Sequence, residues 1–417
     1  MTKRTWLQTG PILAALRRHR MATLLVVLQV ALTLAVVSNA LFIVATRVVH
    51  LSRPSGTDEA NIFVIANQWG SGLDVHRVDA LMRADLAALR GVVGVHDAFA
   101  SEAYPLEGGW GVLTQIKTTS EQTTKPRLGI MYFADDHAID TLGIHLVAGR
   151  NFRADEILRS SSVDTAVASV IIVTRSLAGK LFPGANALDR TVWLPDGPVR
   201  IIGVLDSLQG PYAGSTTRSI DEDTVLYPAR AADLAFGTNY IVRATPGGMD
   251  KTIPAAVAAL WAQSRQRLID PDKGVVTLKQ ARERGYATDR SVALMMGSVS
   301  VLLLLATAAG IVGLSSFWVS QRRRQIGVRR ALGARRQDIL GYFLAENFLI
   351  VTGGIVLGAL LAYAANLGLL KAFELALMPW YVVPLAAVLL WLLGQVAVLG
   401  PARRAAATAP VEAIRQR

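Results

Sequence analysis

The chain has 417 residues, of which 52% are hydrophobic, and a mean hydropathy of +0.37. This composition excludes an ordinary water-soluble protein, because a single core cannot hide so much apolar surface from water. The complete lack of cysteine excludes disulfide bonds and Cys-ligated metal sites, and the net charge of +12, which is concentrated in three short segments beside apolar runs, argues against nucleic-acid binding.

The first predicted element is a membrane-spanning helix at 21–46. This run contains no charged residue, and as a helix it is long enough to cross a hydrocarbon core of about 30 Å. Residues 1–20 carry five basic side chains and no acidic one, and they are expected to form a cytoplasmic amphipathic segment. A cleavable signal peptide is the alternative, but the apolar region of such a peptide is only about 7–15 residues long.

Residues 47–290 are expected to form one large extracytoplasmic α/β domain, because they have a globular composition and are long enough for a core of their own. A strand–helix–strand unit is predicted near each end of this stretch, with an inserted second subdomain at about 110–215 and a mobile loop at 155–169. The predicted elements are strands at 61–67, 94–101, 170–174, 199–205, 240–244 and 275–278 and helices at 76–90 and 251–267.

The remaining segments alternate between apolar spans and basic stretches. The basic stretches are expected to face the cytoplasm, as positively charged flanks of membrane helices do. Both termini then lie inside the cell, and the fold class is a four-helix membrane protein with an extracytoplasmic α/β domain. The predicted segments are a second span at 291–319, a cytoplasmic segment at 320–340, a third span at 341–370, a short periplasmic turn at 371–381, a fourth span at 382–400 and a cytoplasmic tail at 401–417.

The cytoplasmic segment 321–340 (QRRRQIGVRRALGARRQDIL) is the most informative part of the chain. One interpretation is a basic amphipathic segment that lies on anionic lipid and fixes the orientation of the spans. The other is a short rigid helix that docks on a partner subunit, which Gly327 and Gly333 favour because they permit close approach of another backbone. The apolar residues that can share part of its helical surface are Ile326, Ala331, Leu332 and Ile339.

This segment resembles the loop between the second and third spans of MacB/FtsX-type permeases, in which a basic run, Ile-Gly, Arg-Arg-Ala-Leu-Gly-Ala and Asp-Ile-Leu occur in the same order. Residues 344–358 (LAENFLIVTGGIVLG) and 410–415 (PVEAIR) resemble the third span and the C-terminal tail of that family. In the outer domain, the resemblance covers 132–152, where Asn151 replaces the usual Asp, and 177–183 (LAGKLFP). A further departure is Asp189, where a Gly is common.

The resemblance implies a porter-like outer core with an inserted subdomain and a cytoplasmic segment that couples to an ATPase. It also implies partners, namely separate ABC ATPase subunits and a second permease, in a homodimer or a heterodimer. A periplasmic adaptor and an outer-membrane channel are further candidate partners. The coupling residues that it implies are Arg324, Ile326, Gly327, Arg330, Ala331, Leu332, Gly333, Ala334 and Asp338.

Motifs for catalysis and cofactor binding are missing from the sequence. The phosphate-binding pattern Gly-x-x-x-x-Gly-Lys-[Ser/Thr] does not occur, and the run 178–181 lacks the first glycine and the hydroxyl that it needs. We therefore expect no catalytic residue and no cofactor on this chain, with ATP and Mg²⁺ bound by a partner ATPase. His137 and His145 are expected to be structural or exposed, because a metal site needs more ligands at defined spacing.

Three features of the spans have two interpretations each. Gly354 and Gly358 form a GxxxG pattern, which arises by chance in Gly-rich helices or marks helix packing. Glu346 lies in the third span, where a carboxylate needs a partner; the partner is expected to be Arg335 or Arg336, and a coupling role is the alternative. The polar residues of the first span either bond to another helix or are tolerated there by chance; they are Gln29, Ser38 and Asn39.

Taken together, these features predict a permease subunit in the cell inner membrane. It would transmit the motion of a separate ATPase through four helices to the periplasmic domain, for export or extraction of a periplasmic or membrane substrate. The alternatives are an FtsX-like activator of cell-wall hydrolases and a membrane ligand sensor. The cytoplasmic segments are too short to hold a kinase or cyclase domain, which argues against the sensor.

Overall fold

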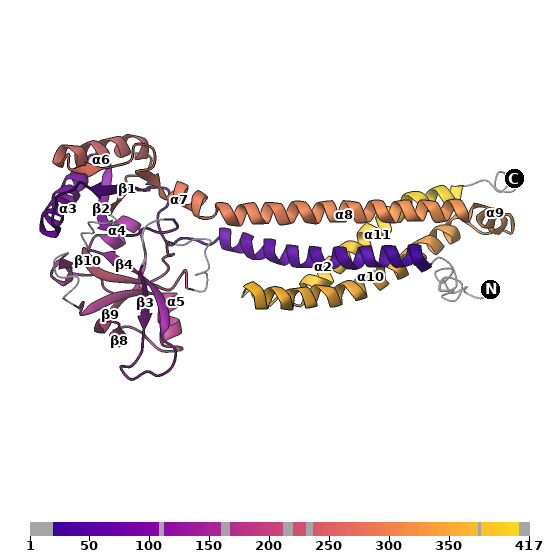
Figure 1. Ribbon diagram of the computed structural model, residues 1–417, viewed down its shortest axis with the longest axis horizontal. Coiled ribbons are helices and arrows are strands. Elements are labelled where there is room, and N and C mark those ends of the chain that lie inside the picture. The colour runs from indigo at the N-terminus through magenta and orange to yellow at the C-terminus, as the bar shows by residue number, and fades with distance from the viewer. Residues whose placement is uncertain are drawn as a thin grey trace. The chain divides into compact units, whose positions relative to one another are not determined.

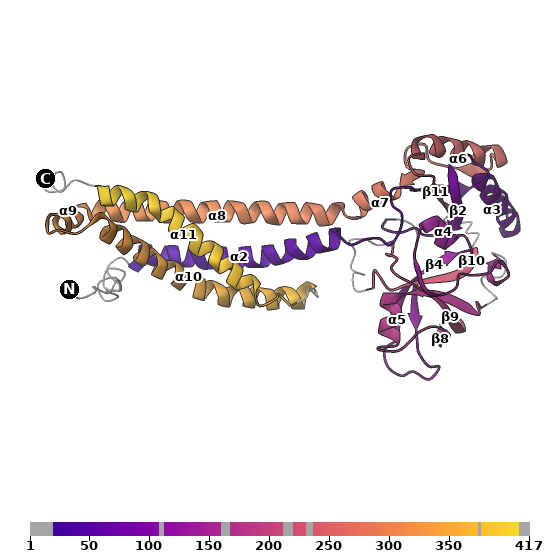
Figure 2. The ribbon, with the colours of Figure 1, turned by 180° about the vertical axis from the view of Figure 1, so that it is seen from behind.

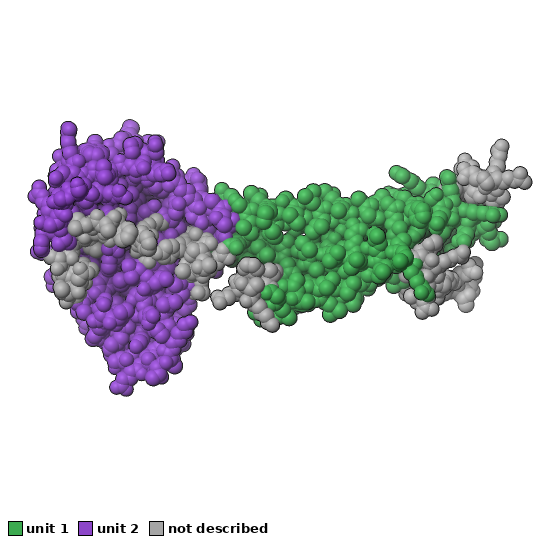
Figure 3. Space-filling model, in the orientation of Figure 1, with its two compact units in different colours: residues 1–51, 290–417 green, residues 52–289 purple. Residues whose placement is uncertain are grey.

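The computed structural model describes residues 20–107, 112–159, 167–211, 220–230, 237–373 and 377–407. The chain forms two compact units, which consist of residues 1–51 with 290–417 and of residues 52–289 (Figure 3). The predicted N-terminal segment, apart from Arg20, and the tail from residue 408 onwards lie outside the described residues.

The first unit is a bundle of long apolar helices (Figure 1). Among the described residues, four helices are long and apolar enough to cross a membrane. Each of the four extends past the predicted span at one end or at both, because a helix satisfies its own backbone hydrogen bonds and need not end where the hydrocarbon does. The helices are α2 (Arg20–Leu51), α8 (Ala287–Gln321), α10 (Arg336–Phe373) and α11 (Val382–Ala407), and the short α9 (Arg323–Ala331) lies between α8 and α10.

The closest helix packing in the bundle joins α10 to α2 at the GxxxG pattern. A Cβ atom added at Gly354 would lie 2.6 Å from the Cβ atom of Val30, and one added at Gly358 would lie 2.8 Å from the carbonyl oxygen of Ala31. Asn39 of α2 donates a hydrogen bond from Nδ2 to the carbonyl oxygen of Ala362, at 3.2 Å. The missing side chains thus bring the two backbones together, as small residues do between membrane helices.

The described residues of the second unit form two sheets. The first has the strand order β12-β1-β11-β2, with β13 also paired to β1, and every pairing is antiparallel. The helices α3 and α6 pack on this sheet through apolar side chains at helical spacing. The elements are β1 (Ile62–Trp69), α3 (Val75–Arg90), β2 (Val95–Ser101), β11 (Thr238–Ala244), α6 (Met249–Gln263), β12 (Arg267–Leu268) and β13 (Val275–Thr277), followed by α7 (Leu278–Gly285).

Both predicted strand–helix–strand units are present in this sheet, but they interlock. Strand β11 of the second unit pairs with β1 and with β2, so the two strands of the first unit are not neighbours. This is a split β-α-β arrangement, in which each helix connects strands that lie one strand apart. The two ends of the outer domain therefore form one subdomain, although more than 130 residues separate them in the chain.

The second sheet has the order β3-β4-β10-β7-β9-β5, with β6 paired to β10 and β8 to β9. Its central strands are apolar and β-branched and are buried. Because β10 lies between β4 and β7, the inserted subdomain extends to Arg230 rather than to about residue 215. The elements are β3 (Val112–Ile116), β4 (Arg127–Ala134), α4 (Ala138–Leu142), β5 (Leu146–Gly149), the 3₁₀ helix η1 (Ala154–Glu156), β6 (Leu158–Arg159), β7 (Val170–Thr174), α5 (Arg175–Leu181), β8 (Thr191–Leu194), β9 (Gly197–Leu205) and β10 (Thr224–Arg230).

The predicted mobile loop at 155–169 has some regular structure at its start. Helix η1 and strand β6 occupy 154–159, and residues 160–166 lie outside the described residues.

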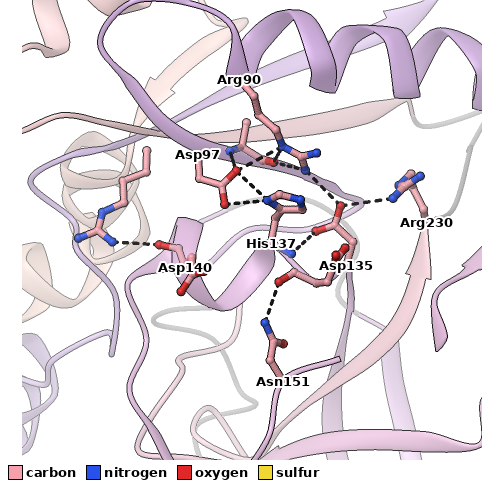
Figure 4. Close-up of polar contacts among 10 residues, drawn as sticks. Arg90, Asp97, Asp135, His137, Asp140, Asn151 and Arg230 are labelled. Carbon is pink, nitrogen blue, oxygen red and sulfur yellow. Dashed lines mark hydrogen bonds and ion pairs between the residues drawn. The ribbon is translucent and has the colours of Figure 1, made fainter. Parts of the chain in front are cut away.

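A charged cluster joins the two sheets of the outer unit (Figure 4). Nδ1 of His137, at the start of α4, lies 2.9 Å from an oxygen of Asp97 on β2. The buried carboxylate of Asp135 lies 3.5 Å from Arg90 and 3.6 Å from Arg230. Burial raises the pKa of Asp135, although the two arginines oppose that effect. The cluster links side chains of both subdomains, so charged contacts help to fix them to each other.

Candidate functional site

The predicted coupling segment forms a short helix with defined ends. The helical hydrogen bonds continue from α8 into α9, because the amide of Arg322 bonds to the oxygen of Trp318 at 3.0 Å and that of Ile326 to the oxygen of Arg322 at 2.9 Å. At the other end, Gly333 has a positive φ of 94°, and the amide of Ala334 bonds to the oxygen of Arg329 at 3.0 Å. This is the Schellman pattern that ends many helices at a glycine.

The turn after α9 leads directly into α10. The Asp338 carboxylate accepts a hydrogen bond from the amide of Arg335 at 2.9 Å, and the amide of Asp338 bonds back to the oxygen of Arg335 at 3.1 Å. A carboxylate in the first turn also favours the positive end of the helix dipole. Asp338 therefore fixes where α10 begins.

The apolar residues of this segment do not share one surface, contrary to the sequence prediction. Ile326 and Ile339 are buried in the core of the helix bundle, together with Phe343 and residues of α11. Ala331 and Leu332 are exposed, and Leu332 is 83% exposed. The prediction treated 321–340 as a single helix, whereas the turn at Gly333 separates α9 from α10.

An exposed apolar patch therefore lies at the end of α9, and we call Val328, Ala331 and Leu332 the α9 patch. Val328 was not among the predicted site residues, although its spacing of three and four residues from the other two places it on their side of the helix. Arginines precede and follow the patch in the sequence. An apolar surface within a charged rim is typical of a protein interaction site.

The other predicted coupling residues take up different positions. Arg324 and Asp338 are exposed, Ala334 is partly exposed and Gly327 is buried; the side chain of Arg330 lies outside the described part of the chain. Of the predicted set, Ile326 and Gly327 thus hold α9 to the bundle, and Ala331 and Leu332 are open to a partner.

Glu346 pairs with Arg322, not with Arg335 or Arg336 as the sequence predicted. Nη1 of Arg322 lies 3.1 and 3.0 Å from the two carboxylate oxygens of Glu346. The arginine side chain is 15% exposed and the glutamate side chain 2% exposed. Arg336 begins the same helix ten residues before Glu346, which is a rise of about 15 Å. Sequence distance therefore gave the wrong partner, because the chain folds back between α8 and α10.

This ion pair and two other contacts hold α9 in place. Arg322 is the single residue between α8 and α9. Its ion pair with Glu346 of α10 therefore fixes the junction of the two helices. The guanidinium of Arg329 lies 5.5 Å from the ring centre of Tyr342 on α10, in a cation–π contact. Together with the buried Ile326, these contacts make α9 a rigid attachment to the bundle.

Groups of three or more His, Cys, Asp or Glu side chains that could hold a metal ion are absent from the described residues. His137 bonds to Asp97 in the charged cluster of the outer unit. What the α9 segment offers chemically is a firmly held apolar patch among arginines, which suits the binding of a protein surface.

Two protein families match this chain. Residues 23–260 match a family described as the MacB-like periplasmic core domain, and residues 297–410 match one described as the FtsX-like permease C-terminal domain.

Curated relatives match over most of the chain. The probable syringafactin export ATP-binding/permease protein SyfD of Pseudomonas syringae pv. tomato is 27% identical over 96% of this chain, and the chain spans 57% of its length. The uncharacterized ABC transporter permease YknZ of Bacillus subtilis is 23% identical over 88% of this chain and 86% of that protein. The macrolide export protein MacB of Nitrobacter winogradskyi is 29% identical over 59% of this chain, which spans 38% of its length.

Solved structures are similar to this chain over about half of its length. The extracellular domain of the transporter YknZ from Gram-positive bacteria is 16% identical, with a TM-score of 0.31, and the match covers 49% of this chain and 98% of that one. The periplasmic region of MacB from Actinobacillus actinomycetemcomitans is 14% identical, with a TM-score of 0.33, and the match covers 56% of this chain and 96% of that one.

Proposed function

Since this chain belongs to the family of FtsX-like ABC transporter permeases with a MacB-like periplasmic core domain, we propose that it is a permease subunit that transmits the motion of a separate ATPase. The α9 patch is the observation that carries this proposal. It presents an 83% exposed leucine on a helix that is fixed to the bundle by the Arg322–Glu346 pair. A push on α9 would then move the bundle rather than bend a loose loop.

The ATPase is proposed to be another chain, because the sequence lacks the glycine-rich phosphate loop that holds ATP and Mg²⁺. Relatives such as SyfD are named as ATP-binding/permease proteins, whereas YknZ is named as a permease. A transporter of this kind needs two ATPase subunits and a second permease, as a copy or a homologue of this chain. The cell inner membrane is the proposed location.

Motion is proposed to leave the bundle through α8. This helix begins at Ala287, next to the outer domain in the sequence, and ends at Gln321, one residue before the ion pair. A continuous helix of that length is about 53 Å long and transmits a push with little bending. The outer domain would then act on a cargo that has already reached the periplasm or the outer leaflet.

Export is the proposed direction of transport. Several matched relatives are named for export, namely of syringafactin, macrolides and pyoverdine, whereas YknZ is named only as a permease. A periplasmic adaptor and an outer-membrane channel would complete such an export route.

Association with an ATPase tests the proposal. The tagged full-length chain is purified in detergent from membranes of its native host, and ATP hydrolysis is measured in the eluate. Leu332→Asp is expected to remove the ATPase, because a carboxylate in the centre of an apolar contact leaves a buried charge. Val93→Asp is the matched control, since Val93 is a 94% exposed apolar residue of the outer unit.

Two results would contradict the proposal. One is retention of an active ATPase by Leu332→Asp at the wild-type ratio. The other is co-purification of a cell-wall hydrolase with no ATPase, which would favour the hydrolase activator.

A further inference from the structure

The outer unit contains a cavity of about 650 Å³ that the proposed function does not use. Its volume is within the range of about 300–1,000 Å³ that is usual for small-molecule sites. Helix α4, which lines the cavity, lies between the two sheets in both ribbon views (Figures 1 and 2). The other parts of the lining are the chain between α2 and β1, the chain between α4 and β5, strand β11 and the residues that follow β9.

Main-chain contacts hold the walls of this cavity together. The amide of Asp58 bonds to the carbonyl oxygen of Leu142 at 3.0 Å, and the amide of Gln209 bonds to that of Ser55 at 2.9 Å. Gly56 has a positive φ of 84°, and a Cβ atom added there would collide with the carbonyl oxygen of Ser207. The chain between α2 and β1 is therefore fixed to both neighbouring walls, and a ligand would enter a site that is already ordered.

The positive charge in the lining is already used by the protein. Nη2 of Arg243 donates to Oδ2 of Asp58 at 2.8 Å, and Nη1 donates to the main-chain oxygen of Asp140 at 2.9 Å, a contact drawn in Figure 4. The charges of Arg243 and Asp58 thus compensate each other. An anionic ligand would have to compete with the Asp58 carboxylate for this guanidinium.

Two further carboxylates line the cavity with less compensation. Within the described part of the chain, the Asp140 carboxylate has no hydrogen bond or ion pair. Asp206 lies 2.7 Å from Arg175, but the two side chains are 50% and 61% exposed, so water weakens their attraction. The charged lining is three aspartates and one arginine, which gives a formal charge of −2 when His145 is neutral.

The remaining lining shows which kind of cation fits. The aspartates do not form a metal site, because groups of three or more His, Cys, Asp or Glu side chains that could hold a metal ion are absent from the described residues. Separate carboxylates suit a ligand whose positive charges are also separate. Apolar contact for the chain between those charges comes from Pro54, Ile139 and Ile144.

We propose that this cavity binds an alkyl polyamine, that is, a ligand with two or more protonated nitrogens on a flexible carbon chain. Its ammonium groups donate hydrogen bonds to the carboxylates of Asp140 and Asp206, and its methylene groups pack against the apolar lining. The proposal is independent of the proposed function, because every lining residue belongs to the outer unit and none is near the α9 patch in the sequence.

Equilibrium dialysis against radiolabelled spermidine tests the proposal on the purified full-length chain in non-ionic detergent. Saturable binding of one spermidine per chain is expected. Asp140→Asn and Asp206→Asn keep the shape of the side chain and remove its charge, and each is expected to weaken binding roughly tenfold. Triacetylated spermidine, which has the same chain without the charges, should not compete.

The matched control is Asp250→Asn. Like Asp140, Asp250 is an exposed carboxylate in the first turn of a helix of the outer unit, but it does not line the cavity. Its affinity for spermidine should equal that of the wild type. Limited proteolysis of the outer domain in the same samples checks that each variant is folded.

Three results would overturn the proposal. The first is the absence of saturable binding at about 1 mM spermidine. The second is equal affinity in the wild type and in the Asp140→Asn/Asp206→Asn double variant. The third is complete displacement of spermidine by an equal concentration of Mg²⁺, which would mean that the cavity attracts any cation. A wild-type chain that binds spermidine but captures no ATPase would contradict only the proposed function.

Discussion

Two buried arginine–carboxylate pairs of this protein differ in how completely they are shielded from water. In the outer unit, Arg267 of β12 and Asp85 of α3 are both fully buried, 2.8 Å apart, and Tyr240 donates a further hydrogen bond to Asp85 at 2.5 Å. In the bundle, Nη1 of Arg322 bonds to both carboxylate oxygens of Glu346, and the arginine side chain is 15% exposed.

The difference separates a contact that is sealed inside a folded core from one that joins two helices beside solvent. Arg267 also donates from Nε to the oxygen of Ser264 at 2.8 Å and lies over the Trp69 ring, so its bonding capacity is largely used inside the core. A buried pair with so many bonds is costly to break, because each loss leaves an unpaired charge away from water. The Arg322–Glu346 pair lies at the water-facing end of a membrane helix, where solvent can replace the lost partner.

The largest expected effect is on the stability of the outer domain. Asp85→Ala leaves the Arg267 guanidinium buried without its carboxylate, and we expect a loss of about 3–5 kcal/mol in the free energy of unfolding. The measurement is proteolysis of the outer domain in the full-length chain over a urea series. Asp272→Ala is the control at an exposed carboxylate, and equal urea midpoints for the two variants would show that the pair does not stabilise the core.

The second-largest expected effect is a loss of stability at the uncharged contact between α2 and α10. Gly358→Leu places a side chain where even a Cβ atom lies 2.8 Å from a backbone oxygen of α2, and we expect a loss of about 1–3 kcal/mol. Gly368→Leu is the matched control on the same helix, since nothing lies within 4 Å of a Cβ atom there. Thermal unfolding in detergent compares the two, and equal transition temperatures would exclude a tight α2–α10 contact.

The Arg322–Glu346 pair is expected to affect coupling rather than folding. Glu346→Gln keeps the shape of the side chain but removes its charge, and we expect coupled ATP turnover to fall about tenfold, which corresponds to about 1.4 kcal/mol. The stability of the outer domain should change by less than about 0.5 kcal/mol. If Glu346→Gln has normal ATP turnover, or if its outer domain unfolds, the Arg322–Glu346 pair does not have the coupling role that distinguishes it from the Arg267–Asp85 pair.

The smallest expected effect concerns a half-exposed pair and depends on pH. Glu59 lies 2.6 Å from Arg282 and accepts a hydrogen bond from Ser55 at 2.5 Å. Burial by itself raises the pKa of Glu59, but the bonds from Arg282 and Ser55 outweigh it and hold that pKa below its ordinary value of 4.5. The folded state therefore gains stability from the charged form above pH 4.5 and loses it as the pH falls through the lowered pKa.

Glu59→Gln should accordingly be less stable than the wild type at pH 7, by no more than about 1 kcal/mol, because both partners are partly exposed. Urea unfolding of the two proteins is compared at pH 7 and at pH 3. The difference in the free energy of unfolding between the two proteins should be smaller at pH 3 than at pH 7. A larger difference at pH 3 would mean that folding raises the pKa of Glu59.

The sequence was sufficient to predict elements whose signal is local. The four spans follow from long apolar runs with at most one charged residue inside them. Helix α3 follows from its periodicity, and β1 and β7 follow from short apolar runs. Their ends were less predictable, because the helices continue past the apolar stretch into water.

Features that depend on pairing between distant residues could not be predicted. Strand β11 lies between β1 and β2 in the sheet, although it follows β2 by more than 130 residues in the chain. Nothing in the residues of β11 specifies that position. The partner of Glu346 is an arginine on another helix, although closer arginines exist in the sequence. The burial of Ile326 likewise depends on where the chain turns at Gly333.

The central claim is that force enters at a helix inside the cell and acts on a domain outside it, and the most direct test is the sidedness of two single cysteines. Because the chain has no cysteine, Val93→Cys and Leu332→Cys each introduce one thiol, at positions that are 94% and 83% exposed. Spheroplasts are treated with a membrane-impermeant maleimide before and after lysis. The account predicts that Val93→Cys is labelled in intact spheroplasts and Leu332→Cys only after lysis, and labelling of Leu332→Cys in intact spheroplasts would contradict it.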